Sequence, residues 1–204
     1  MAVILNGKEV AKKTRENLKS KVEELKKKNI FPKLAVIMVG DDGASKIYVR
    51  NKSKACEELG IEYEEFLLDE NTTQQQLLQL INELNERKDV HGILLQSPVP
   101  KHLDINEAFR TISPEKDVDG FNPVNVGKLV LGQDTFISCT PFGVMKLLEE
   151  YNIETEGKNA VVIGRSNIVG KPMLQCLLNK HATVTICHSK TENLKEITKK
   201  ADIL

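Results

Sequence analysis

The chain has 204 residues, enough to bury a sizeable core in one large or two modest α/β domains. Lysines and arginines together number 29, as do aspartates and glutamates, so the formal net charge is zero. This balance excludes a broad electrostatic attraction for nucleic acid or for an anionic membrane, and it favours a small molecule as the partner.

The cysteines and the N-terminus indicate the compartment. Cys56, Cys139, Cys176 and Cys187 are widely spaced, with no C-x-x-C pair and no nearby histidine pair that completes a zinc site. We therefore expect free thiols and no metal. The first apolar run, residues 2–5, is too short for a signal-peptide core, and no segment reaches membrane-spanning length. These features predict a cytoplasmic protein.

The first part of the chain alternates between helical and strand patterns. Apolar residues at helical spacing are expected to form helices over residues 10–28, 44–59 and about 77–84. A continuous apolar run predicts a strand over residues 34–39, and further strands are predicted over residues 61–68 and 92–95. The alternation predicts a mostly parallel sheet with helices between its strands.

Two segments after these strands have the composition of loops. Gln96 to Pro100 follows the strand over residues 92–95, and ligands bind at the carboxyl ends of strands in open α/β sheets. Lys116 to Pro123 combines acids and turn formers without a helical or strand period, which predicts a loop between two halves. Taken alone, Asp117 and Asp119 are best interpreted as turn-capping residues.

A second α/β segment is expected after this loop. Thr140 and Pro141 have the pattern of an N-cap and a first helical residue, which predicts a helix that connects the two halves. A buried strand at residues 160–163, a turn between Gly164 and Gly170 and a helix start follow. A second strand is predicted over residues 183–187, and a third only begins at residues 201–204.

The turn after residue 163 departs from the dinucleotide fingerprint G-x-G-x-x-G. Ser166 stands where the second glycine normally lets a pyrophosphate approach the backbone. Arg165 lies within the turn, and the strand over residues 183–187 ends in His188, Ser189 and Lys190 instead of an acid. Positive charge without a carboxylate favours a 2′-phosphate. The glycine pattern alone also fits a purely structural turn with a solvated arginine.

The helix predicted over residues 44–59 carries a possible functional face. Tyr48 and Lys52 are four residues apart and therefore share a face, and Ser45 lies three residues before Tyr48 on the same side. This spacing allows an aromatic ring and an ammonium to line one cleft.

Five motifs, in this order, resemble the bifunctional methylenetetrahydrofolate dehydrogenase/cyclohydrolase family. They are Tyr48-x-x-x-Lys52, Gln96-Ser-Pro-Val-Pro100, Lys116-Asp-Val-Asp-Gly-Phe121, Thr140-Pro-Phe-Gly143 and Gly164-Arg-Ser-x-Ile-Val-Gly170-x-Pro-Met. The ordered set is far more specific than any single motif. The resemblance implies an α/β fold of two domains: a folate-binding catalytic domain over residues 1–139, with a mostly parallel sheet, and a Rossmann-like NADP-binding domain over residues 140–204.

The resemblance implies two reactions in one shared cleft. The first is NADP-dependent oxidation of 5,10-methylene-tetrahydrofolate to the methenyl cation, and the second is hydrolysis of that cation to 10-formyl-tetrahydrofolate. Lys52 matches the catalytic lysine, Tyr48 the residue that orients the folate, Gln96 the partner of the lysine, and Asp119 the carboxylate that holds the pterin. Pro98 and Pro100 belong to the same folate site.

The resemblance also implies the cofactor site and the assembly. The cofactor-binding residues are Gly164, Arg165, Ser166, Ile168, Val169, Gly170, His188 and Ser189. Arg165 and Ser189 match the groups on the 2′-phosphate. A homodimer through the nucleotide-binding domain is implied as well.

The proposed role of Lys52 is chemically reasonable. The methenyl carbon is already electrophilic, so water attack mainly needs proton transfer at a positioned group, worth about 10² to 10⁴ in rate. A cationic intermediate beside Lys52 and burial of the ammonium both lower the pKa of a lysine, which makes its neutral amine accessible near neutral pH. The hydride step needs mainly correct positioning of the two reactants.

Two departures from the family pattern affect these expectations. Ser97 stands where the family usually has leucine, so we expect an altered contact with the folate. Family chains also continue by roughly a third beyond Leu204, and we expect the dehydrogenase activity of this chain to be weaker than its cyclohydrolase activity. Two alternatives are an unrelated NADP oxidoreductase and a shortened chain that retains only folate or nucleotide binding, or only the cyclohydrolase activity.

Overall fold

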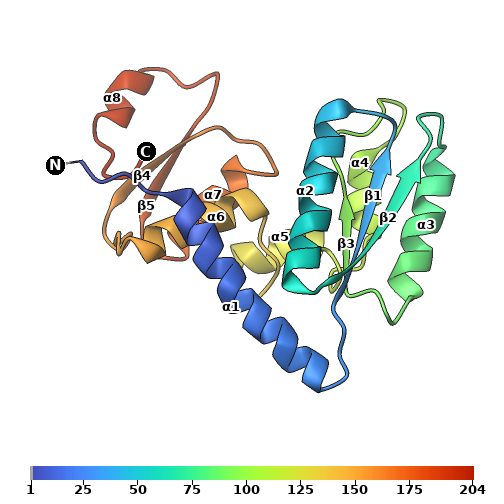
Figure 1. Cartoon of the computed structure of the whole chain (residues 1–204). Coiled ribbons are helices and arrows are strands. Elements are labelled where there is room, and N and C mark those ends of the chain that lie inside the picture. The colour runs from blue at the N-terminus through green and yellow to red at the C-terminus, as the bar shows by residue number, and fades with distance from the viewer. Residues whose placement is uncertain (1) are drawn as a thin grey trace. The chain divides into compact units, whose positions relative to one another are not determined.

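The structure is a computed structural model that describes residues 2–204 and has an α/β fold (Figure 1). The chain packs as two units. The first unit comprises residues 11–118, and the second comprises residues 119–204 together with residues 2–10. These are units of packing, whereas the functional division into residues 1–139 and 140–204 stays a prediction.

The first unit contains a parallel sheet with the strand order β2-β1-β3. The elements in chain order are α1 (Gly7–Lys27), whose residues 7–10 belong to the second unit, β1 (Lys33–Val39), α2 (Gly43–Leu59), β2 (Glu62–Leu68), α3 (Gln74–Glu86), β3 (Gly92–Leu95) and α4 (Ile105–Thr111). The predicted alternation of strands and helices is confirmed, and the strand predicted over residues 92–95 has those bounds.

Helices cover both faces of this sheet. On one face, Ala35, Ile37 and Val39 of β1 pack against side chains of α3 and α4. On the other face, Val36 and Met38 pack with Val49 of α2. Because both faces are covered, β1 reads in the sequence as a continuous apolar run and not as an alternating one.

The second unit has a smaller parallel sheet of two strands, β4 (Asn159–Ile163) and β5 (Thr183–Cys187). Its helices are α5 (Pro123–Val130), α6 (Cys139–Glu150), α7 (Gly170–Leu178) and α8 (Leu194–Thr198). The predicted start of a third strand is confirmed, because Ile203 forms a parallel bridge with Ala160 and accepts a hydrogen bond from Val161 N at 2.8 Å.

Three short helices were not expected from the sequence: α4, α5 and α8. They have seven, eight and five residues, so each is too short to establish a clear helical period. The local start signals were nevertheless present. The side chain of Asp104 caps α4 by accepting from Asn106 N and Glu107 N, and Asn122 caps α5 with Pro123 as the first helical residue.

The predicted start of α6 is wrong by two residues. The helix begins at Cys139 with Ser138 as its N-cap, and Thr140 and Pro141 lie inside its first turn. Pro141 is tolerated there because the first N–H groups of a helix have no intrahelical acceptor. The Ser138 hydroxyl donates to Ile168 O and makes no capping bond to its own helix, so this residue joins α6 to the turn before α7.

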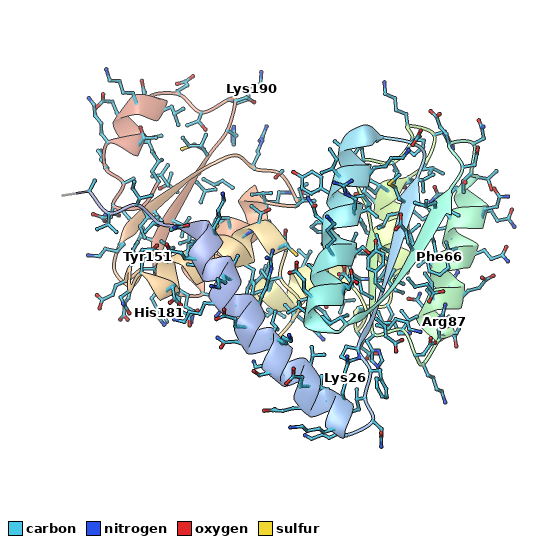
Figure 2. All side chains as sticks on the ribbon, viewed as in Figure 1. Lys26, Phe66, Arg87, Tyr151, His181 and Lys190 are labelled. Atoms are coloured by element: carbon cyan, nitrogen blue, oxygen red, sulfur yellow. The ribbon has the colours of Figure 1, made fainter. Side chains whose placement is uncertain are left out.

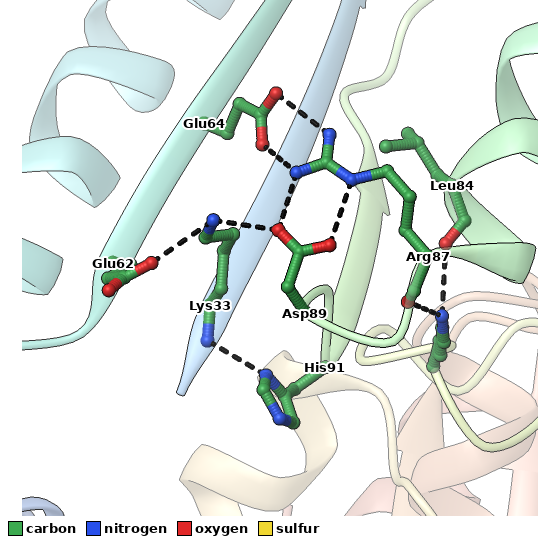
Figure 3. Close-up of polar contacts among 8 residues, drawn as sticks. Lys33, Glu62, Glu64, Leu84, Arg87, Asp89 and His91 are labelled. Atoms are coloured by element: carbon green, nitrogen blue, oxygen red, sulfur yellow. Dashed lines mark hydrogen bonds and ion pairs between the residues drawn. The ribbon is translucent and has the colours of Figure 1, made fainter. Parts of the chain in front are cut away.

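A network of ion pairs joins β1, β2 and the loop before β3 (Figure 3). Arg87 donates to both carboxylate oxygens of Glu64, at 2.9 and 2.8 Å, and also to Asp89. Lys33 Nζ bonds Asp89 at 2.9 Å and lies 3.1 Å from Glu62. The Arg87 guanidinium, followed by Lys33, holds the pKa of Asp89 well below its usual range, and Arg87 lowers the pKa of Glu64.

This network should make stability depend on pH in the acidic range. A carboxylate whose pKa is lower in the folded state contributes stability above its ordinary pKa, here 3.8 for Asp89 and 4.5 for Glu64, and loses it as the pH falls. We expect Arg87→Met to reduce the free energy of unfolding more at pH 7 than at pH 3, measured by urea unfolding. Arg50→Met, which removes an exposed arginine of α2, should show no such pH dependence. An equal loss at both pH values for Arg87→Met would contradict this role.

Candidate active site and nucleotide-binding loop

Lys52 and Gln96 meet in the first unit. The α2 helix starts with the Asp42 side chain accepting from Ser45 N at 2.7 Å, and Lys52 follows two turns further on. Lys52 Nζ donates to Gln96 Oε1 at 2.7 Å. Gln96 comes directly after β3, is only 9% exposed, and its backbone N–H donates to Ile37 O. The predicted contact between the lysine and the glutamine is therefore present.

The amide of Gln96 is held in one orientation. Its Nε2 donates to Ser97 O at 2.7 Å, which leaves Oε1 to accept from Lys52. A buried side chain with both ends bonded has little rotational freedom, so Gln96 presents a fixed acceptor to the ammonium. The arrangement suits a lysine that must be held in place while it takes up or releases a proton.

The other residues predicted for the folate site in this unit are accessible. Tyr48, one turn before Lys52 on α2, is 63% exposed. Ser45, in the first turn of the same helix, is only 2% exposed. Pro98 is exposed and Pro100 is half-buried, both in the loop that follows β3. The Tyr48 ring, one turn from Lys52, and the proline-containing loop directly after Gln96 are therefore both accessible to a ligand.

Asp117 and Asp119 have different environments. Asp117 is 2% exposed and forms a parallel bridge with Ile93 of β3, so its backbone is a buried part of the sheet edge. Asp119 is half-buried in the second unit, where its Oδ1 lies 3.9 Å from Cys139 Sγ. Cys139, an exposed thiol, was not among the predicted site residues, and its wide spacing from other cysteines gave no signal.

The turn between β4 and α7 is tightly closed. Gly164 has a φ of +128°, which favours glycine. A Cβ at Gly170 would overlap Gly164 O and lie 2.6 Å from Gly164 C and 2.9 Å from Arg165 Cα. Ser166 Oγ accepts from Val169 N at 3.2 Å and from Gly170 N at 3.3 Å. The serine in place of the second glycine therefore bonds two backbone amides at the start of α7.

The carboxyl ends of β4 and β5 bring the predicted cofactor residues to one edge of the sheet. The Gly164 amide donates to Cys187 O at 2.8 Å, which joins the two strand ends. His188 N donates to Thr191 Oγ1 and His188 Nδ1 accepts from Lys190 N, so this loop is locally ordered. Thr191 was missed by sequence reasoning because it lies outside the motifs. Figure 2 shows Lys190 on the loop that follows β5.

These features fit a phosphorylated dinucleotide. Residues 188–190 carry no carboxylate, and Arg165, Ser166, Ile168, Val169 and Ser189 are exposed, whereas Gly170 is buried and Gly164 and His188 are half-buried. An exposed guanidinium and hydroxyl beside the ends of two parallel strands match the chemistry that a 2′-phosphate requires.

Other sites are not evident in the described residues. Within residues 2–204, no group of histidine, cysteine, aspartate and glutamate side chains could hold a metal ion, and no helix is long and apolar enough to cross a membrane. All four cysteines are free thiols, and burial raises the pKa of the Cys56 and Cys176 thiols. A shallow hollow on α3 is lined by residues of that one helix alone and includes no predicted site residue.

Known proteins share both the sequence and the structure of this chain. Residues 5–119 match the tetrahydrofolate dehydrogenase/cyclohydrolase catalytic domain, and residues 138–204 match the NAD(P)-binding domain of that family. The bifunctional protein FolD of Acetivibrio thermocellus is 56% identical over 203 residues, which is 100% of this chain and 71% of that protein.

Two solved structures extend the comparison. The bifunctional FolD methylenetetrahydrofolate dehydrogenase/cyclohydrolase of Campylobacter jejuni has a TM-score of 0.97 at 53% identity, covering 98% of this chain and 71% of that one. The Trypanosoma brucei enzyme, complexed with NADP cofactor and inhibitor, has a TM-score of 0.93 at 37% identity, covering 98% and 70%. The chain therefore belongs to the tetrahydrofolate dehydrogenase/cyclohydrolase family.

Proposed function

We propose that this chain oxidises 5,10-methylene-tetrahydrofolate to the methenyl form with NADP and hydrolyses the methenyl form to 10-formyl-tetrahydrofolate. Family membership supports the pair of reactions. The observation that carries the hydrolytic half is the 2.7 Å hydrogen bond between Lys52 Nζ and Gln96 Oε1. Spectroscopic assays of the two half-reactions on one sample test the proposal, and folate or nucleotide binding without turnover would replace it with a binding function.

Lys52 is the proposed proton-transfer group of the hydrolysis. Water adds to the electrophilic methenyl carbon and gives one proton to Lys52. The bond from that carbon to one ring nitrogen then breaks as the remaining hydroxyl proton moves to this nitrogen, which leaves a formyl group and a secondary amine. A positive charge on the bound substrate disfavours a second positive charge beside it, so a neutral Lys52 amine is available to accept the proton. Gln96 accepts from Nζ and keeps the lysine in place. This mechanism needs no metal.

The remaining residues of the proposed folate site act in binding. Tyr48 presents an exposed ring that can pack on the flat pterin, and Pro98 and Pro100 stiffen the loop after Gln96. Asp119 is proposed to bind the pterin through its carboxylate, which suits the donor-rich edge of that ring. We propose that Ser97, in place of a leucine, changes the contact with the folate without abolishing it.

NADP is the proposed cofactor, and it accepts the hydride when bound. The proposed contacts come from the turn Gly164, Arg165, Ser166, Ile168, Val169 and Gly170 and from His188 and Ser189. Arg165 and Ser189 are assigned to the 2′-phosphate because both are exposed and residues 188–190 include no acid to repel it. The closed turn holds its own amides through Ser166, so side chains carry much of the recognition.

Replacing Arg165 by alanine should reduce selectivity for NADP. Loss of a charge-assisted hydrogen bond to the 2′-phosphate should weaken NADP binding by about 1.5 to 3 kcal/mol, with little effect on NAD. Calorimetric titrations with both dinucleotides measure the two affinities. Lys158→Ala serves as the control. It removes a cation directly before β4, at the opposite end of that strand from Arg165, and should leave both affinities unchanged. Equal losses for both dinucleotides in Arg165→Ala would refute the assignment.

Location and assembly are proposals of the same kind. We propose a cytoplasmic enzyme that forms a homodimer through the NADP-binding domain and that binds neither nucleic acid nor membranes. The zero net charge and the free cysteines support this view. Light scattering over a range of protein concentrations measures the mass, and a monomer at micromolar concentration would contradict the dimer.

A further inference from the structure

Lys116 makes an unusual set of hydrogen bonds in the first unit. Its Nζ donates to three backbone carbonyls at the end of α3: Leu84 O at 3.0 Å, Asn85 O at 2.7 Å and Arg87 O at 2.7 Å. Figure 3 shows the Leu84 and Arg87 carbonyls that accept two of them. The last carbonyls of a helix have no intrahelical donor, and a cation there also interacts favourably with the helix dipole. One side chain thus caps α3 and ties its own backbone to that helix.

The backbone that follows Lys116 is an added segment of the sheet. Ile93 N donates to Lys116 O at 2.7 Å, and Asp117 forms a parallel bridge with Ile93. Val118 lies over Gly92, where a Cβ would approach Val118 Cγ1 to 2.5 Å. Residues 116–118 therefore run parallel to β3, in the direction of its carboxyl end, and the next residue in the chain is Asp119.

The chain is also fixed on the other side of Asp119. Gly120 has a φ of +67°, and a Cβ there would lie 2.6 Å from Phe136 O within the second unit. Asn122 then caps α5 by accepting from Val124 N at 2.8 Å. The backbone is therefore held on both sides of Asp119: before it by the hydrogen bonds of Lys116, and after it by the close approach of Gly120 to Phe136.

We propose that Lys116 is a positioning residue for folate binding: its three hydrogen bonds to α3 fix the segment that delivers Asp119. The inference rests on the proposed function, in which Asp119 binds the pterin. The ammonium of Lys116 donates its hydrogen bonds to carbonyls at the end of α3, so it acts through the backbone and not by touching the substrate. Without it, the carbonyls of Leu84, Asn85 and Arg87 each lose a hydrogen bond to a charged donor, and α3 loses this link to the segment 116–118, whose backbone still bonds to Ser113 and Ile93.

The test is the hydrolysis of methenyl-tetrahydrofolate by Lys116→Met. We expect the KM to rise about tenfold, roughly the effect of losing hydrogen bonds to a charged group, with kcat within about twofold of the wild type. Partial unfolding would instead lower the active fraction and the apparent kcat while leaving KM unchanged. The affinity for NADP should stay the same, because the proposed cofactor residues lie beyond residue 163.

Lys33→Met is the matched control. Lys33 is also a lysine of the first unit with hydrogen-bonded partners, but none of them lies in residues 116–119. It should leave KM unchanged even if stability falls. Lys116→Gln keeps two N–H donors without the charge. If the methionine variant does not fold, a KM for Lys116→Gln between that of the wild type and the expected increase of about tenfold supports the positioning role, and a wild-type KM contradicts it.

A double-mutant cycle separates positioning from a general structural role. Asp119→Ala should itself raise KM by at least about tenfold, and adding Lys116→Met to it should change KM by less than about twofold, since coupled residues are not additive. A KM equal to the wild type in a folded Lys116→Met, or full additivity in the double variant, overturns the inference while the proposed function stands. A wild-type chain that neither binds nor hydrolyses methenyl-tetrahydrofolate overturns both.

Discussion

Replacing Lys52 by methionine should abolish the hydrolysis of methenyl-tetrahydrofolate while folate still binds. Methionine keeps the length and apolar stem of the side chain but has no proton to exchange, and Gln96 Oε1 loses the donor that now lies 2.7 Å away. General acid or base groups contribute about 10² to 10⁴ in rate, so we expect a loss in this range. The rate is measured by the disappearance of methenyl-tetrahydrofolate, and folate affinity by direct titration.

Lys54→Met provides the control for this variant. Lys54 is an exposed lysine two residues further along α2, so the substitution makes the same change of charge and helix propensity on another face of the helix. Its rate should equal that of the wild type. If Lys52→Met hydrolyses the substrate at the original rate, Lys52 is structural and the proposed proton transfer is wrong.

Replacing Gly170 by alanine should disrupt the nucleotide-binding loop. The added Cβ would overlap Gly164 O and lie 2.9 Å from Arg165 Cα, and these are backbone atoms that cannot move aside cheaply. Overpacking of this kind costs up to about 3 kcal/mol, and here it displaces the residue proposed to bind the 2′-phosphate. We expect a lower free energy of unfolding in urea and a loss of NADP affinity of more than about tenfold.

Gly127→Ala is the matched control for the loop. Gly127 lies in α5, in the same unit, and a Cβ there meets nothing within 4 Å. Alanine in a helix is favoured over glycine by about 0.5 to 1 kcal/mol, so this variant should be as stable as the wild type or more stable, with unchanged NADP affinity. A Gly170→Ala variant that matches Gly127→Ala in both measurements would show that the turn can open without cost.

Sequence patterns were sufficient where a signal repeats along the chain or occurs in an ordered set. The apolar runs predicted β1, β3 and β4 because a strand covered on both faces must be continuously apolar. The motif around Lys52 and Gln96 predicted their contact, and the structure confirms it at 2.7 Å. The short helices α4 and α5 were missed, because seven or eight residues do not establish a period even with good capping residues.

By itself, the sequence determined the α/β class, the strand positions and the family, since these depend on local periodicity and on motifs read in order. Only the tertiary structure decided what depends on contacts between distant residues. Asp117 lies in a segment that the sequence predicted as a loop, and the structure makes it a buried part of the sheet edge. The first turn of α6 starts at Cys139, with the Ser138 hydroxyl bonded 30 residues away to Ile168. The contacts of Lys116 could not be read from its motif, because the carbonyls that it binds become its neighbours only when the end of α3 packs beside the segment 116–118 that leads to Asp119.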